Sequence, residues 1–354
     1  MALYHEQIDD FVELTLNKYE KDAWVDISLP LQEYHFAAKW FKDKKKPSRG
    51  GPRCEWKLRV DNQGTAKHSG LYAVDNTNRK NVMTNGKQEW SKQTVNYIFD
   101  IDEDAFQSGP ETIVREMLLN EQGLYNDFFQ LMETAMWTAP SSDSQDPRPP
   151  SGVPFWLQKA SAAAPSFQGG DPAGFSSGAA GIATGTYERW KNYAGQYTQV
   201  SRDDLIEKVV NACDFTYFKA PRSYPEIGGG EAQYGLYTVH SVLAECRQIL
   251  EGQNDNLGRH AGWGANGEVL IKSNPLTWVP ALTESSSDAY DSQNPFYGIN
   301  WKKFQYFFKE GRDMVKYPPK PAARQHTVRE RHMDNWGNFI CYDRRQGGFV
   351  FHVA

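Results

Sequence analysis

The sequence predicts an α+β protein, and three observations support this fold class. A strong helical pattern spans residues 109–137, and two shorter ones follow near 201–213 and 238–252. Strand-like patterns precede these helices between residues 50 and 101, and strands return from residue 268 to the C-terminus. Helices and strands that are grouped along the chain in this way are typical of α+β proteins.

Large aromatic side chains are frequent in this otherwise polar chain. The 354 residues are enough for two domains, or for one domain with large excursions. Hydrophobic residues make up only 39 %, yet the chain has 11 Trp, 18 Tyr and 19 Phe. Because large aromatic residues dominate both cores and interfaces, we expect some of this apolar surface to meet neighbouring molecules.

The sequence indicates neither a membrane protein nor a disulfide framework. It has no run of about 18 apolar residues, and its acidic, amphipathic start lacks the basic and apolar parts of a signal peptide. Its four cysteines are scattered, so we interpret them as small buried residues of a protein made in a reducing cytosol. They are Cys54, Cys213, Cys246 and Cys341.

The net charge of −5 conceals blocks of opposite sign. Residues 1–38 have a net charge of −6, residues 39–92 of +9, residues 93–299 of −14 and residues 300–354 of +6. Such blocks either pair between copies of the chain or are solvated faces that happen to be segregated.

The N-terminal part predicts extensions that need an external surface. Residues 3–20 have helical spacing with one apolar face, which docks either on a neighbouring subunit or on the protein's own core. Residues 42–49 are a basic chain breaker. Residues 54–60, 71–74 and 94–101 have strand patterns, and Asn85-Gly86 indicates a turn. Residues 50–100 therefore predict a long basic hairpin with too few apolar positions for a core of its own.

The helix at 109–137 has the clearest boundary signals. Ser108 and Glu111 form a capping-box pattern at its start, and it stops before Pro140. Its apolar stripe consists of Met117, Leu124, Phe128, Leu131 and Ala135.

Two loops and two further helices are expected next, before the C-terminal strands. Residues 140–152 and the Ala/Gly/Ser-rich residues 160–186 are predicted to be loops, the second of them flexible. Ser201 caps one helix, whereas Thr238 opens another that Gly252 closes. Strands are then expected at 269–272, 278–282, 311–316, 325–333, 338–342 and 349–353.

No motif nominates a catalytic, cofactor or metal site. Residues 262–267 match GxGxxG, but a strand follows instead of a helix, which favours a turn. Asp100, Asp102 and Asp104 resemble a calcium loop, but Ala105 replaces the glycine of that motif. This departure favours an acidic strand-to-helix junction. We therefore predict no enzyme activity, no cofactor and no metal.

Dedicated nucleic-acid binding is also not favoured. The basic block carries Trp40, Trp56 and Trp90, which are of the type that stacks on bases. However, the chain as a whole is acidic and has no known nucleic-acid motif, so only sequence-independent contact with DNA is expected.

Several short sequence segments resemble those of one subfamily of tailed-phage major capsid proteins, which have the fold named after phage HK97. They are GVPFW at 152–156, YERWKNYAGQY at 187–197, PLTWVPAL at 275–282, NPFYGINW at 294–301 and WGNFICYDRR at 336–345. The HK97-like resemblance implies an N-terminal arm (1–41), an extended β-hairpin loop (42–95), a peripheral domain with a long spine helix (96–149), an axial domain (150–280) and a return to the peripheral β-sheet (281–354).

This resemblance implies a structural protein that assembles into hexamers and pentamers, forming an icosahedral head around double-stranded DNA. It implies a location in the virion capsid after assembly in the host cytoplasm, with no membrane association. The expected partners are further copies of the chain, together with portal, scaffolding and decoration proteins. The alternatives are an encapsulin-like nanocompartment shell protein and a carbohydrate-binding module.

The candidate inter-subunit residues belong to the basic hairpin. We expect this hairpin to lie on an acidic surface of an adjacent copy, so that salt weakens assembly. Trp56 is expected to anchor on that neighbour instead of within its own fold. The candidates are Lys44, Lys45, Lys46, Arg53, Trp56, Lys57 and Arg59.

Overall fold

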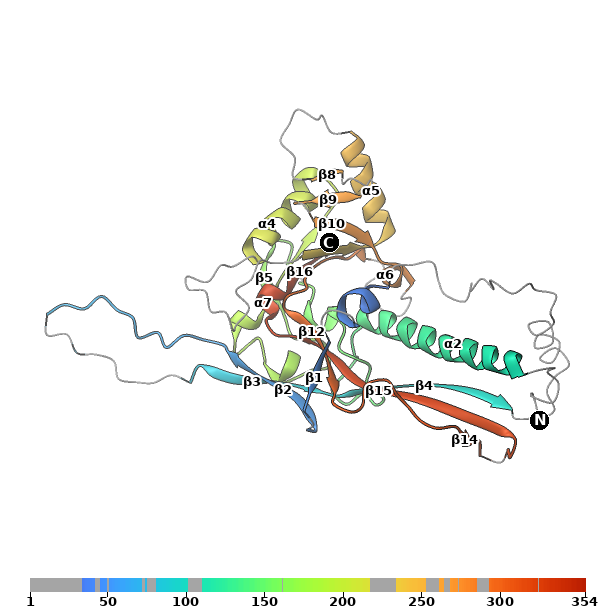
Figure 1. Cartoon of the computed structure of the whole chain (residues 1–354). Helices are drawn as coiled ribbons and strands as arrows, with labels where there is room; N and C mark the ends of the chain where they lie inside the picture. Colours follow the sequence, from blue (N-terminus) through green and yellow to red (C-terminus); the bar gives the residue numbers. More distant parts are fainter. Residues whose placement is uncertain are drawn as a thin grey trace.

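The computed structural model is an α+β fold, as the sequence predicts. Figure 1 shows a central body with a hairpin extending to one side and a long helix with a ribbon of strands extending to the other. The expected helix at 3–20, Asp102, Asp104 and Lys44 lie outside the described residues. The structure describes residues 34–41, 45–49, 51–71, 74, 81–100, 110–160, 162–216, 234–252, 261–263, 268–272, 274–284, 293–323 and 325–354.

An eight-stranded mixed sheet forms one half of the body. The C-terminal strand β16 (Gly348–Val353) lies inside it, parallel to β6 (Asn192–Tyr197) and antiparallel to β11 (Phe296–Asn300). β11 is an inner strand of the sheet, and it is buried at every position. The strand order is β5 (Ser166–Gly169), β6, β16, β11, β7 (Tyr234–Thr238), β10 (Asn274–Trp278), β9 (Val269–Ile271) and β8 (Ala261–Trp263).

The helices of this half lie against the same sheet. Helix α4 (Glu207–Thr216) contacts β16, and α5 (His240–Glu251) contacts β8, β9 and β10 (Figure 1). As predicted, Ser201 accepts a hydrogen bond from the backbone of Asp204 at the start of the helical segment that leads into α4. Gly252 ends α5, although that helix begins at His240, two residues after the predicted Thr238.

A six-stranded sheet organised around one long strand forms the other half. β15 (Val328–Cys341) pairs antiparallel with β4 (Ser91–Asp100) along ten residues and with β12 (Phe304–Lys309) along five. Helix α2 (Pro110–Met136) contacts β4. β15 also pairs with β13 (Val315–Lys316) and β14 (Lys320–Pro321), and β12 pairs with β1 (Lys45–Ser48).

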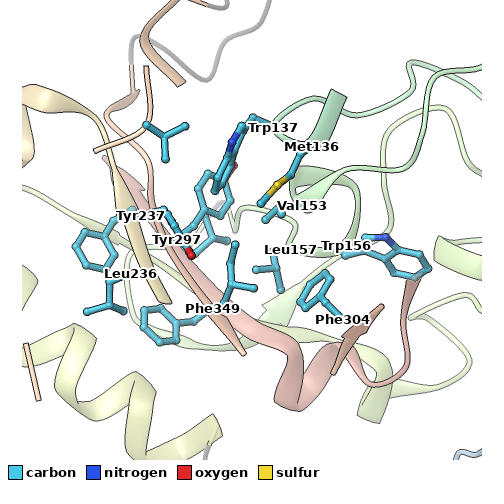
Figure 2. Close-up of a cluster of buried hydrophobic side chains, with 14 of the residues drawn as sticks. Met136, Trp137, Val153, Trp156, Leu157, Leu236, Tyr237, Tyr297, Phe304 and Phe349 are labelled. Carbon is cyan, nitrogen blue, oxygen red and sulfur yellow. The ribbon is translucent and has the colours of Figure 1, made fainter. Parts of the chain in front are cut away.

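An aromatic core connects the two sheets at the C-terminal end of α2. Figure 2 shows Trp137 lying near Tyr237 and Tyr297 of the eight-stranded sheet, with Phe304 of the six-stranded sheet in the same cluster. The ring centroids of Trp137 and Tyr237 are 5.3 Å apart. Three short helices complete this region: α3 (Val153–Trp156), α6 (Ala281–Glu284) and α7 (Arg344–Gly347).

Three expected features of the middle and C-terminal regions differ from the structure. Residues 160–186 contain β5 and several buried residues, because their small side chains permit close packing: a Cβ on Gly169 would lie 2.0 Å from Asn192 Oδ1. The strand predicted at 278–282 lies at 274–278 instead, and α6 follows Pro280. Within 311–316 only the last two residues are strand, since Gly311 and Met314 have positive φ.

Other differences concern the phase of α2 and the hairpin. Leu131 is 48 % exposed, whereas Met132 is buried, so the apolar stripe is rotated by one residue there. Asn85 and Gly86 lie inside strand β3 (Met83–Glu89) and not in a turn. Within the predicted basic breaker, Lys45–Ser48 form strand β1, in which Pro47 is tolerated because β1 is an edge strand.

Candidate assembly surfaces

The hairpin consists of β2 (Arg53–Arg59) and β3, which pair in antiparallel register from Arg53 opposite Glu89 to Arg59 opposite Met83. Beyond these strands the chain projects away from the body (Figure 1). Leu71 and Val74 in this projection are 94 % and 89 % exposed. A projection that buries so little of its own surface can be covered only by another molecule or by solvent.

The outer face of the hairpin is basic. Arg53, Lys57, Arg59 and Lys87 are exposed on it, whereas Glu55 is its exposed acid. Arg53 Nη2 lies 3.1 Å from Glu89 Oε1, so one cation is balanced within the subunit. Lys57 and Arg59 face Asn85 and Met83, which carry no charge. The part of the strands nearest the projection therefore presents positive charge outward.

The inner face of the hairpin is locked onto the body by Trp56. This residue is only 9 % exposed, and its ring centroid lies 6.3 Å from that of Trp156 and 6.2 Å from that of Tyr342. Gly86 lies directly opposite, where a Cβ would come within 2.6 Å of the indole. The expectation that Trp56 anchors on a neighbour instead of within its own fold is therefore wrong.

Polar contacts fix the base of the hairpin to the segment that follows α2. Gln88 Nε2 donates a hydrogen bond of 2.5 Å to Ser151 Oγ. Arg148 Nη1 lies 3.2 Å from both Glu89 Oε2 and Asp143 Oδ1. Beside these contacts Cys54 is buried, and this burial raises the pKa of its thiol to about 11. The hairpin therefore leaves the body from a rigid base.

The lysines before the hairpin occupy different environments. Lys45 Nζ lies 2.5 Å from Asp313 Oδ2 and 3.8 Å from the ring centroid of Phe41, so it pairs within the subunit. Lys46 is exposed on the opposite face of β1. The structure thus places Lys46, Lys57 and Arg59 outward, and it turns Lys45 and Trp56 inward.

The long helix and the ribbon are tied together by charge. Glu121 of α2 lies 2.7 Å from Arg331 Nη1 and 3.1 Å from Lys316 Nζ, and these two cations come from β15 and β13. All three side chains are about one-quarter exposed. A hydrogen bond to Tyr125 raises the pKa of Lys316, and a hydrogen bond to Tyr97 raises the pKa of Arg331. The negative charge of Glu121 raises both pKa values further.

A buried arginine, which the sequence analysis did not predict as a site, joins distant segments of the body by hydrogen bonds. Arg344 Nε donates a 2.7 Å hydrogen bond to the Trp156 carbonyl, and its Nη2 donates to the Gly170 carbonyl (2.8 Å) and to Asn192 Oδ1 (3.1 Å). Burial lowers the pKa of this guanidinium to about 10. No periodicity predicts this role, because an arginine is ordinarily exposed.

The described part of the chain has three further features, which concern metal-ligand geometry, cysteines and the length and polarity of its helices. It contains no group of three or more His, Cys, Asp or Glu side chains arranged to hold a metal ion. Its four cysteines are buried free thiols, in agreement with the prediction. None of the described helices is both long and apolar enough to cross a bilayer.

Comparison with known proteins identifies the fold. No family model and no curated protein matches the sequence. Solved structures do match: the capsid asymmetric unit of cyanophage A-1(L) has a TM-score of 0.56 at 10 % identity, over 94 % of this chain and 96 % of that chain. Over nearly its whole length, the chain therefore has the HK97-like fold of phage capsid subunits, as the sequence predicts.

Two further structures support this assignment. The capsid of cyanophage P-SCSP1u has a TM-score of 0.51 at 12 % identity, over 97 % of this chain and 94 % of that chain. The capsid of an empty GTA particle, computed with C5 symmetry, has a TM-score of 0.52 at 9 % identity, over 93 % of this chain and the whole of that chain.

Proposed function

We propose that the chain is the major capsid protein of a tailed bacteriophage, a shell subunit that is not an enzyme. The observation that carries this proposal is the capsid fold shared over more than nine-tenths of the chain with subunits of phage heads. A carbohydrate-binding module is not supported by this likeness, because 94 % of the chain matches a capsid subunit.

The proposed assembly consists of hexamers and pentamers that enclose double-stranded DNA. Rings of identical subunits need heterologous contacts, in which different patches of one chain meet. The basic outer face of the hairpin is one candidate patch, and acidic residues within 93–299, a segment with a net charge of −14, are candidates for the other. The capsid of the empty GTA particle, whose subunit has a similar fold, was computed with five-fold symmetry, which is the symmetry of a pentamer.

The hairpin acts in this proposal as a strap on an adjacent copy. Its outward cations Lys57 and Arg59 supply the charge, and the exposed Met83 beside them supplies apolar contact. Lys46 adds a cation near the base of the hairpin.

The further partners in this proposal are portal, scaffolding and decoration proteins. The chain contacts packaged DNA without sequence preference. Its location is the virion capsid, after assembly in the host cytoplasm.

Electron microscopy and sedimentation of the chain expressed alone, and then with its neighbouring genes, test this function. We expect closed shells, tubes, or rings of five and six subunits. Particles purified from cells that express the neighbouring genes should contain DNA; particles that contain a protein cargo instead would identify a nanocompartment. A chain that stays monomeric under both conditions would contradict the shell function.

A further inference from the structure

Within the part of the chain that the structure describes, one edge of strand β4 is unpaired along its whole length. Its ten residues pair with β15 on one side. On the other side, no backbone hydrogen bond joins it to any part of the chain that the structure describes. The other edge strands in the described residues are shorter: seven residues in β2 and β3, four in β1 and β5, three in β8 and two in β13 and β14.

This edge lacks the usual protection against pairing. Long edge strands expose unpaired backbone groups, and monomeric proteins interrupt them with proline, bulges or several charges. The register of β4 with β15 runs without a break, and β4 contains no proline. Its exposed residues before Asp100 are Lys92, Thr94, Asn96 and Ile98, and Ile98 is 58 % exposed. Such an edge is a template for another strand.

The sequence of β4 is complementary to itself. A twofold axis at Asn96 would pair two β4 strands in antiparallel register and keep the exposed side chains on one face. This register places Lys92 opposite Asp100, Thr94 opposite Ile98, and Asn96 opposite Asn96. Moving the axis to either neighbouring residue separates Lys92 from Asp100, so the charges favour this one register.

The charged ends of β4 are already held in position. Lys92 Nζ lies 3.0 Å from Asp334 Oδ2, and Asp100 Oδ2 accepts a 3.1 Å hydrogen bond from Thr327. A partner strand would therefore add a second contact to each charged group at little cost in side-chain entropy.

We propose that β4 pairs with β4 of a second copy around a twofold axis at Asn96, which joins two six-stranded sheets into one. The contact is isologous, so it connects two subunits and closes, whereas the hairpin strap makes a heterologous contact. This inference rests on the proposed shell function, because the second copy is supplied by self-assembly, and a closed icosahedral shell contains twofold axes.

Cysteine cross-linking of assembled particles tests this contact. In the proposed register Asn96→Cys faces itself, at a separation that a disulfide spans. Thr94→Cys is the matched control, since the two copies of residue 94 would be about 14 Å apart along the ladder. The double variant Thr94→Cys/Ile98→Cys restores facing pairs. The native thiols are buried and do not interfere with mild oxidation.

We expect non-reducing electrophoresis to show dimers for Asn96→Cys and for the double variant, and monomers for Thr94→Cys alone. Dimers of Thr94→Cys in equal amount would overturn the register. Shells that form but give no Asn96→Cys dimer would overturn the β4 contact while leaving the shell function intact. If β4 amides are protected from exchange in those shells, another segment, such as residues 1–33, covers the edge.

Discussion

Single side chains decide how the hairpin is held, and Trp56 is the clearest case. Its indole lies between the hairpin and the body, in contact with Trp156 and Tyr342, and directly over Gly86. Burying a tryptophan removes a large apolar area from water, so its loss leaves a cavity. The stability of the isolated subunit and the path of the hairpin therefore depend on the same residue.

Trp56→Ala is expected to destabilise the unassembled subunit by about 3–5 kcal/mol. Denaturant unfolding measures this change, and Lys57→Ala is the matched control because the neighbouring side chain is exposed on the opposite face. The control should change the free energy of unfolding by less than about 0.5 kcal/mol. A Trp56→Ala subunit as stable as wild type would contradict the burial seen here.

His35 gives the subunit a pH-dependent stability. It is 2 % exposed between Trp137 and Tyr237, and burial, assisted by the charge of Lys39, lowers its pKa from 6.5 to about 4. Between these values the unfolded chain binds more protons than the folded one. The stabilising contribution is therefore complete above pH 6.5 and is lost as pH falls toward 4.

We expect wild-type stability to fall across this range by up to about 3 kcal/mol more than that of His35→Gln. Unfolding titrations at pH 7, 6, 5 and 4 measure the difference. His332→Gln is the matched control for the substitution itself, because that imidazole is 38 % exposed. Identical slopes for wild type and His35→Gln would rule out this contribution.

At the scale of secondary-structure elements, α2 and the β4–β15 ribbon are joined by partly exposed ion pairs. Glu121→Gln removes the carboxylate that forms ion pairs with both Lys316 and Arg331. Because such pairs are weak and screened, we expect a loss of about 1 kcal/mol at low salt that shrinks in 1 M salt. Asp127→Asn, an exposed acid on the same helix, is the control. A salt-independent loss would indicate packing instead of charge.

Patterns in the sequence predicted those elements whose periodicity and boundary signals lie within the element itself. The start and end of α2, the Ser201 cap, strand β2 and the ends of β16 follow from periodicity and turn chemistry. Strands β6, β7, β11 and β12 were not predicted as strands. Their aromatic and glycine residues serve contacts between segments far apart in the sequence; for example, a Cβ on Gly298 would collide with the ring of Phe349.

The same limit applies to the candidate assembly surface. Alternation in β2 correctly indicated that Lys57 and Arg59 point outward. It could not indicate the inward position of Lys45, whose partner Asp313 is supplied by the C-terminal part of the chain. Trp56 was misplaced for the same reason, because Trp156 and Tyr342 are distant in sequence.

At the scale of the whole molecule, the fold separates a self-sufficient body from a projection that has no core. The aromatic residues that connect the two sheets are buried, whereas the hairpin beyond Arg59 is exposed at most described positions. Stability and assembly should therefore depend on different residues. Substitutions on the outer face of the hairpin should leave the stability of the subunit unchanged and should impair assembly.

The double variant Lys57→Glu/Arg59→Glu tests this separation. Its unassembled subunit should unfold within about 0.5 kcal/mol of wild type, because both side chains are exposed. Assembly, followed by light scattering and electron microscopy, should be impaired, since the strap would now repel an acidic surface. Wild-type assembly should weaken as salt rises from 0.05 to 1 M, while the variant should respond less, because exposed charges are screened beyond roughly 3 Å at 1 M.

Arg202→Glu/Arg247→Glu is the control, because it changes net charge equally on exposed residues of the other half of the body. If this control impairs assembly as strongly, overall charge and not the hairpin controls association. If the hairpin variant forms normal shells and wild-type assembly is indifferent to salt, the strap hypothesis fails. Normal stability with lost shells would assign the hairpin to contact between copies, because the Trp56 anchor keeps its base in place in either case.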